Sequence, residues 1–228
     1  MGIRIFTSRA EFAQALEANR VIGFDDVDSS PEPRVQINPD RYNGLNINGE
    51  NGFFVDEDFD FPNDYVPVSG PNSAAPGSNQ TTVTFTNDSE AVSAFGTAFI
   101  DADFPDLGDS RLTVRDSNNE VLATETVTTG NGESAFLGIQ SSNFGTGEPI
   151  QDIATVELQT GSGDPTVFEN EGVVLDDFVL PAQEFDSSDA QTHAMGPANV
   201  ATGFIPDSAT LNDVVGFGAG DVSQVKLF

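Results

Sequence analysis

Two pairs of neighbouring aspartates give the clearest chemical signal in this chain. Asp25 and Asp26 follow the apolar run VIGF, and Asp176 and Asp177 interrupt the apolar run GVVLDDFVL. An ionised carboxylate that faces a protein core needs a cation or several hydrogen-bond donors, because burying an isolated charge costs more than a fold can offset. Calcium suits such a position, since it takes about six to eight oxygen ligands.

The four aspartates permit three interpretations. They hold a structural Ca²⁺ if the first and last regular strands lie close together, as they often do in a jelly roll. Alternatively, one member of each pair lies at a sheet margin and is solvated, or the pairs are catalytic carboxylates. Calcium is the leading hypothesis, because side-chain alternation would turn one member of the second pair toward the same side as Leu175 and Val179.

Two further acidic clusters have the alternating oxygens of a calcium loop. The segment DEDFDFPND is not an EF-hand, because it lacks the glycine at the sixth position and has Pro67 where the glutamate should stand. Each cluster is either a calcium-binding loop or a solvated acidic loop. The first contains Asp56, Asp58, Asp60 and Asp64, and the second, DADFPDLGD, contains Asp101, Asp103, Asp106 and Asp109.

The chain has few side chains suited to other kinds of catalytic or binding site. The chain has no Cys and a single His, His193, so Cys-His chemistry and a zinc site of several His or Cys ligands are excluded. GFGAGD, residues 216–221, lacks the spacing and the following helix of a dinucleotide-binding loop. Sugar-binding sandwiches usually present Trp or Tyr, and this chain has no Trp and only Tyr42 and Tyr65.

The charge of the chain excludes several partners. The 37 acidic residues outweigh the 8 basic ones, and the net charge is −29. This surface repels nucleic acid and anionic membranes, and it needs salt or divalent ions to screen its self-repulsion. We therefore expect no nucleic-acid partner. We also expect no membrane insertion, because no apolar run reaches about 18 residues.

The N-terminal segment MGIRIF lacks the features of a signal peptide. We therefore expect either that a leader was removed or that the chain is assembled inside a cell.

The elements that must position these residues are short strands. Ser8 and Glu11 form a capping-box pattern that predicts one N-terminal helix over residues 8–18, a plug over one end of the core. From Val21 onward, ten segments rich in Val, Thr, Ile and Phe alternate with Gly, Asn, Pro and Asp clusters, and RLTVRD and EVLATETV form a hairpin. These features predict an all-β, two-sheet antiparallel sandwich of the jelly-roll type.

The domain organisation follows from a change in composition near residue 180. We predict a β-sandwich domain over residues 1–180. Residues 181–228 begin with a polar stretch and end in a weakly alternating, apolar tip. They form either the last strands of the same sandwich or an arm that adds a strand to the sheet edge of a neighbouring subunit.

Four stretches of the chain together resemble a known family. IFTSRAEFAQALEANRVIGFDDVD, YNGLNINGENGFFV, AVSAFGTAFID with LTVRDSNNEVLATETV, and AFLGIQ followed by VVLDDFVL resemble the β-sandwich domains of bacterial exported proteins with a PEP-CTERM sorting signal. The resemblance covers about residues 4–180. It implies a surface-associated, non-enzymatic domain similar in outline to calcium-stabilised carbohydrate-binding jelly rolls. The sorting tail itself is absent from residues 181–228.

These observations lead to one functional hypothesis and two alternatives. We expect a non-catalytic structural protein, a calcium-stabilised sandwich displayed on a surface or built into an extracellular or viral assembly. Its partners would be copies of itself or other assembly subunits. The alternatives are a carbohydrate-binding module, with a glycan as ligand, and a carboxylate-dependent polysaccharide hydrolase or lyase.

Overall fold

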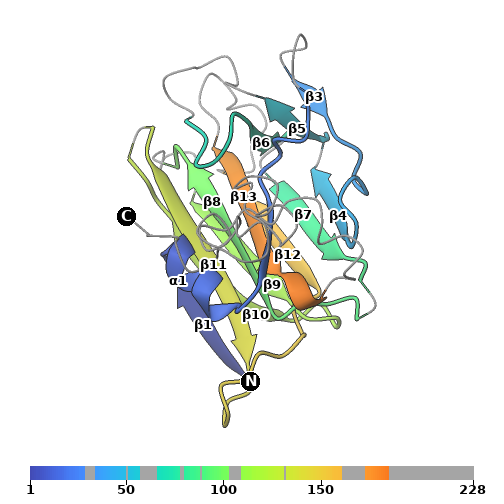
Figure 1. Cartoon of the computed structure of the whole chain (residues 1–228), viewed down its shortest axis with the longest axis vertical. Coiled ribbons are helices and arrows are strands. Elements are labelled where there is room, and N and C mark those ends of the chain that lie inside the picture. Colours follow the sequence, from blue (N-terminus) through green and yellow to red (C-terminus); the bar gives the residue numbers. More distant parts are fainter. Residues whose placement is uncertain are drawn as a thin grey trace, which may run out of the picture. The chain divides into compact units, whose positions relative to one another are not determined.

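The computed structural model describes a sandwich of two antiparallel sheets with one short helix (Figure 1). The predicted all-β class is confirmed. The described residues are 1–28, 34–49, 51–56, 66–77, 80–87, 89–102, 109–130, 132–160 and 173–184. The predicted C-terminal extension, with His193 and the GFGAGD segment, lies outside them from residue 185 onward.

The two sheets differ in size. The larger one has eight strands in the order β1-β11-β8-β13-β6-β5-β3, with β2 pairing β13 off this path, and the smaller one has the order β10-β9-β12-β7-β4. The strands of the larger sheet are β1 (Gly2–Phe6), β2 (Asn19–Ile22), β3 (Val35–Gln36), β5 (Phe53–Asp56), β6 (Ser73–Pro76), β8 (Ala94–Ile100), β11 (Ser134–Ser142) and β13 (Val174–Pro181). Those of the smaller sheet are β4 (Leu45–Gly49), β7 (Gln80–Phe85), β9 (Ser110–Arg115), β10 (Val121–Val127) and β12 (Thr155–Gln159).

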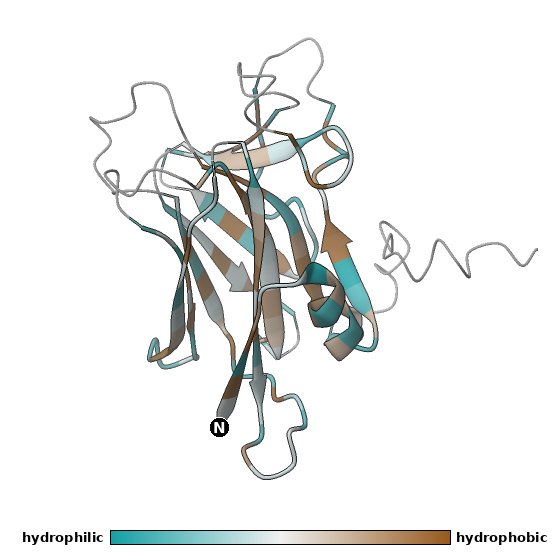
Figure 2. Cartoon of the chain, turned by 90° about the vertical axis from the view of Figure 1, so that its left-hand side faces the viewer, coloured by the Kyte–Doolittle hydropathy of each residue, from teal (hydrophilic) through white to brown (hydrophobic). Residues whose placement is uncertain are grey.

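The main core fills the space between the sheets. Hydrophobic and hydrophilic positions alternate along several strands (Figure 2), so that one side of each strand is apolar. Phe178 of β13 lies at the centre of this core, with ring centroids 5.1 Å from Phe24 and 5.2 Å from Phe95. Aromatic residues thus join β13, β8 and the turn after β2.

Helix α1 (Arg9–Ala15) covers the outer face of the larger sheet. Phe12 is fully buried and belongs to a second apolar cluster, which includes Ala94 but not its neighbour Phe95 of the main core. Because successive strand residues face opposite sides, this cluster lies outside the sandwich. The predicted helix is confirmed, with Ser8 as its N-cap accepting from the Glu11 amide, but it ends at Ala15 rather than at residue 18. Its predicted place over one end of the core was wrong.

The strand predictions succeed in the regular regions and fail at irregular ones. The β9–β10 hairpin is confirmed by its antiparallel register. Two strands with weak sequence signals, β3 and β6, were missed. The segment VIGFDDV is a strand only to Ile22, so Asp25 and Asp26 lie in the turn that follows β2 rather than within the strand.

A glycine under α1 tests how closely the helix packs on the sheet. A Cβ atom built on Gly138 of β11 would lie 2.7 Å from the Phe12 ring, whereas one built on Gly145 would meet nothing within 4 Å. We expect Gly138→Ala to lower the free energy of unfolding by about 1–3 kcal/mol through overpacking, and Gly145→Ala to leave it nearly unchanged. Urea unfolding of both variants measures the difference, and equal stabilities would contradict this packing.

Candidate functional site

The acidic pair in β13 lies at a β-bulge. Asp176 pairs with Ala98 of β8, but Val179 pairs with Gly96, so two residues of β13 face one residue of β8. Asp177 has φ 52°, in the left-handed region. The bulge interrupts alternation, and Leu175 and Phe178 both reach the main core. The premise that one aspartate must face the same side as Leu175 therefore does not hold.

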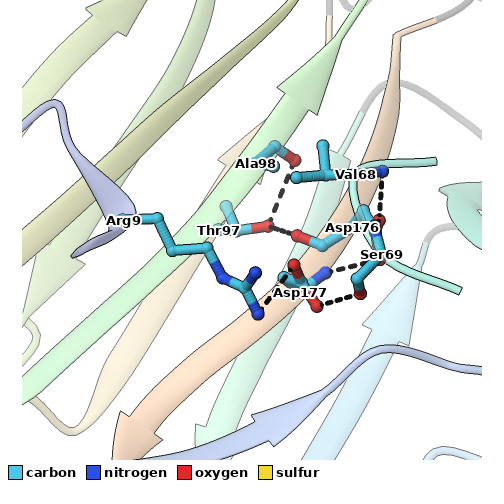
Figure 3. A network of polar contacts seen from close by, with 7 residues as sticks. All are labelled: Arg9, Val68, Ser69, Thr97, Ala98, Asp176 and Asp177. Carbon is cyan, nitrogen blue, oxygen red and sulfur yellow. Dashed lines mark hydrogen bonds and ion pairs between the residues drawn. The ribbon is translucent and has the colours of Figure 1, made fainter. Parts of the chain in front are cut away.

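Asp176 holds a loop against the outer face of the sheet. Its side chain is fully buried, and Oδ2 accepts hydrogen bonds from the backbone amides of Val68 (2.7 Å) and Ser69 (3.0 Å). Oδ1 accepts from the amide of Asp177 at 2.7 Å. The hydroxyl of Thr97 donates to the carbonyl of Asp176 at 2.9 Å, so the backbone of the bulge is also satisfied (Figure 3).

Asp177 joins the same loop to helix α1. Its side chain is fully buried, and Oδ1 accepts from the hydroxyl of Ser69 at 2.6 Å. The guanidinium of Arg9, the first residue of the helix, lies 3.0 Å from Oδ2 (Figure 3). This ion pair provides the positive charge that a buried carboxylate requires. Three segments remote in sequence therefore meet at one bulge.

The environment of Asp176 opposes its ionisation. Burial, and then the neighbouring charge of Asp177, raise the pKa of Asp176 to about 7, against the lowering effect of its three N–H donors. The carboxyl group of Asp176 thus changes charge near neutral pH.

The turn after β2 brings Asp25 to the same place. β2 pairs directly with β13, with Ile22 opposite Phe178, so the predicted proximity of the two segments is confirmed. A Cβ atom built on Gly23 would lie 3.3 Å from Asp25 Oδ2 and from Ser69 Oγ, and 3.4 Å from Asp177 Oδ1. Three side-chain oxygens therefore surround the open side of Gly23. We call this group, Asp25, Ser69 and Asp177, the oxygen ring.

Gly70 makes room for the ring. Its φ is +61°, and a Cβ atom there would lie only 2.0 Å from the carboxylate oxygens of Asp25. Only glycine fits both the backbone conformation and the contact.

Asp26 belongs to a different cluster. Arg41 donates to its Oδ2 at 2.9 Å, and the hydroxyl of Tyr42 donates to its Oδ1 at 2.9 Å. Burial, with the charge of Asp26, raises the pKa of Tyr42 far above its ordinary value, so the phenol stays protonated and keeps donating. These contacts stabilise the turn after β2.

Only some of the other predicted ligands belong to the described residues. Asp56 ends β5 nearly buried, 3.9 Å from Arg34, and Asp101 accepts from the amide of Gly132 at 2.7 Å. Asp109 is exposed. The predicted ligands Asp58, Asp60, Asp64, Asp103 and Asp106 lie outside the described residues.

The arrangement of acids bears on the calcium hypothesis. Within the described part of the chain, no three Asp, Glu, His or Cys side chains are grouped so that they could hold a metal ion. A cation in the oxygen ring would need the Ser69 hydroxyl and backbone carbonyls besides its two carboxylates, which are ligand types that Ca²⁺ accepts. It would also lie close to Arg9. Calcium at Asp25, Asp26, Asp176 and Asp177 stays a prediction.

A polar groove of about 760 Å³ lies elsewhere, beside the end of helix α1. Gln140 and Ser93, both almost fully buried, line it together with Glu184, whose Oε2 accepts from the Ser93 amide at 2.8 Å. Burial raises the pKa of Glu184 above its ordinary value. Glu17 and Glu148 also line the groove, and among the described residues that form it there is no aromatic side chain.

Sequence reasoning missed the partners of the aspartates. Arg9, Ser69 and Thr97 have no motif of their own, and each is far from β13 in sequence. One usable signal was the scarcity of cations, since an Arg in the first helical turn is one of only 8 basic residues. No helix among the described residues is long and apolar enough to cross a membrane.

Comparisons with known proteins give no family for this chain. No protein-family model and no curated protein matches it. An arabinose-bound GH51 α-L-arabinofuranosidase aligns at 16% identity and a TM-score of 0.32, over 72% of this chain and 26% of the enzyme. The K2 cleaved adhesin domain of Lys-gingipain aligns at 10% identity and a TM-score of 0.29, over 72% of this chain and 99% of that domain. Neither similarity supports an inference about function.

The Arg9–Asp177 pair can be tested with a double-mutant cycle. We expect Arg9→Met to lower the free energy of unfolding by about 3–5 kcal/mol, because it leaves a buried carboxylate without its cation. In an Asp177→Asn background the same change should cost less than about 1 kcal/mol. Arg4→Met, at an exposed Arg that bonds the neutral Gln140, is the matched control. Equal effects in both backgrounds would show that the pair contributes nothing.

The raised pKa of Asp176 predicts a pH dependence of stability. Between its ordinary value of 3.8 and about 7, the folded state keeps a proton that the unfolded state has lost. The contribution of this group to stability therefore falls as pH rises through that window, by up to about 1.4 kcal/mol per pH unit, and is constant above it. Urea unfolding in chelator from pH 4 to 8 should show this slope in the wild type and a flatter curve in Asp176→Asn. Parallel curves would refute the assignment.

Proposed function

We propose that this chain is a non-catalytic structural protein, a calcium-stabilised β-sandwich displayed on a surface or built into an extracellular or viral assembly. The observation that carries the proposal is that the acidic pair in β13 is buried and bonded to other parts of the protein. Asp176 and Asp177 are fully buried and their oxygens face Arg9, Ser69 and backbone amides. Such groups hold loops and helix to a sheet, and they are not open to a substrate.

The oxygen ring supports the calcium part of the proposal. Asp25 and Asp177 come from adjacent segments and share the space beside Gly23 with the hydroxyl of Ser69. A chain with a net charge of −29 also gains stability from any bound divalent cation, since the ion reduces self-repulsion. In this arrangement calcium would supplement the charge of Arg9 at the bulge.

The carbohydrate-binding alternative has less support. The groove beside α1 offers amides and carboxylates that could bond hydroxyl groups, but its described lining has no aromatic ring for the apolar face of a sugar. We therefore favour the structural role.

Calcium linkage and particle mass test the proposal together. Ca²⁺ at 100 times its dissociation constant should raise the free energy of unfolding by about 2.7 kcal/mol. The double variant Asp25→Asn/Asp177→Asn should lose this calcium-dependent increase. The control variant Asp116→Asn, at an exposed turn, should show the same increase as the wild type. Light scattering in calcium and in chelator gives the mass. A single-chain mass with identical melting curves in both buffers would rule the proposal out.

A further inference from the structure

One edge of the larger sheet is open. Strand β1 ends the strand order and pairs only with β11, from Gly2 opposite Ser142 to Phe6 opposite Gly138. Within the described residues, no strand lies on its other side. An unpaired edge presents a row of backbone N–H and C=O groups that another strand can bond.

The edges at β3, β4 and β10 are blunted. Ile47 of β4 donates its amide to the carbonyl of Pro39, so the turn before β4 covers that edge. β10 has a register shift between Val121 and Ala123, and β3 has only two residues. A bulge, a covering loop and a short strand are among the devices by which proteins prevent edge pairing. β1 shows none of these three, and Arg4 is its single charged side chain.

The β1 edge also carries apolar side chains that the fold leaves uncovered. Ile3 and Ile5 face the same side of the strand, and Ile3 packs against the main core while Ile5 is 40% exposed. Phe144, 86% exposed, follows β11, and its Cα would lie 4.0 Å from a Cβ atom built on Gly2. Ile5 therefore extends the apolar row of the sandwich interior to the sheet margin, and Phe144 adds an exposed apolar side chain near the start of β1.

Charge decides which partner suits this edge. Residues 1–10 and 134–147, which include β1 and β11, contain no Asp or Glu, whereas the chain as a whole carries −29. Arg4 gives β1 a positive charge, whereas Glu17, Glu148 and Glu184, which line the same groove, come from outside these two segments. Two copies of a strongly acidic chain repel each other least where each lacks acids.

From these observations we propose that two copies of this chain associate through their β1 edges, antiparallel across a two-fold axis, so that their larger sheets form one continuous sheet. The exposed Ile5 side chains would then cover each other's core margin. A two-fold contact of this kind uses the same surface on both copies. The inference names a surface for the assembly role proposed above, and it needs no calcium.

Light scattering of the full chain tests the surface. At about 1 M salt, which shortens the screening length to about 3 Å, the wild type should have at least twice the 24.1 kDa mass of one chain. Ile5→Glu should halve that mass, because it places two carboxylates in the dimer contact. Val121→Glu, on the edge strand β10 of the smaller sheet, is the matched control and should leave the mass unchanged.

A cross-linking experiment covers the case in which Ile5→Glu fails to fold. The chain has no Cys, so Ile5→Cys introduces a unique thiol, and oxidation should yield a covalent dimer. Val121→Cys should stay single under the same conditions.

The outcomes separate this inference from the assembly role. An assembly whose mass Ile5→Glu leaves unchanged overturns the surface while the structural role stands. If Val121→Glu lowers the light-scattering mass as Ile5→Glu does, the two-fold contact is overturned and pairing between β1 and β10 takes its place. A single-chain mass at every salt concentration overturns the surface, and in calcium it counts against the assembly role too. A dimer that dissociates with Ile5→Glu but melts identically in calcium and chelator supports the surface and leaves only the calcium part of the proposal in error.

Discussion

Two carboxyl groups buried on the central strand of the larger sheet constrain the whole structure. A carboxylate without solvent must find donors or a cation, and β13 itself offers these two side chains only the amide of Asp177. The chain supplies them from elsewhere: backbone amides at Val68 and Ser69, and the guanidinium of Arg9. The loop before β6 and the helix after β1 are therefore fixed by electrostatics as well as by packing.

The bulge at Asp177 makes this arrangement compatible with an apolar core. With regular alternation, one carboxylate would point between the sheets and Phe178 would point away from them. At the bulge, β13 has one residue more than the facing part of β8, and Asp177 there adopts the left-handed conformation. Both carboxylates therefore point outward, and Phe178 points back into the aromatic cluster. Asp and Asn tolerate this conformation better than most residues, which explains an aspartate at that position.

The predictable parts of the structure are those set by local patterns. Regular alternation in β7, β9 and β12 and the cap at Ser8 depend on neighbouring residues, so the sandwich, the hairpin and the helix could be derived from the sequence. The bulge could not, since its register shift depends on pairing with β8. Arg9 and Ser69 were also out of reach, because their contact with Asp177 exists only after remote segments have met. The sequence shows that the acidic pairs are unusual within apolar runs, but it does not show which residues bond to them.

The position of β13 in the larger sheet has a consequence for the order of assembly during synthesis. β13 is the last strand described, yet it lies between β8 and β6 and also pairs with β2. The half of the sheet built from β1, β11 and β8 cannot join the half built from β3, β5 and β6 until Pro181 has left the ribosome. Until then the larger sheet stays divided into two incomplete halves, and this slow, long-range closure exposes the nascent chain to aggregation until β13 is inserted.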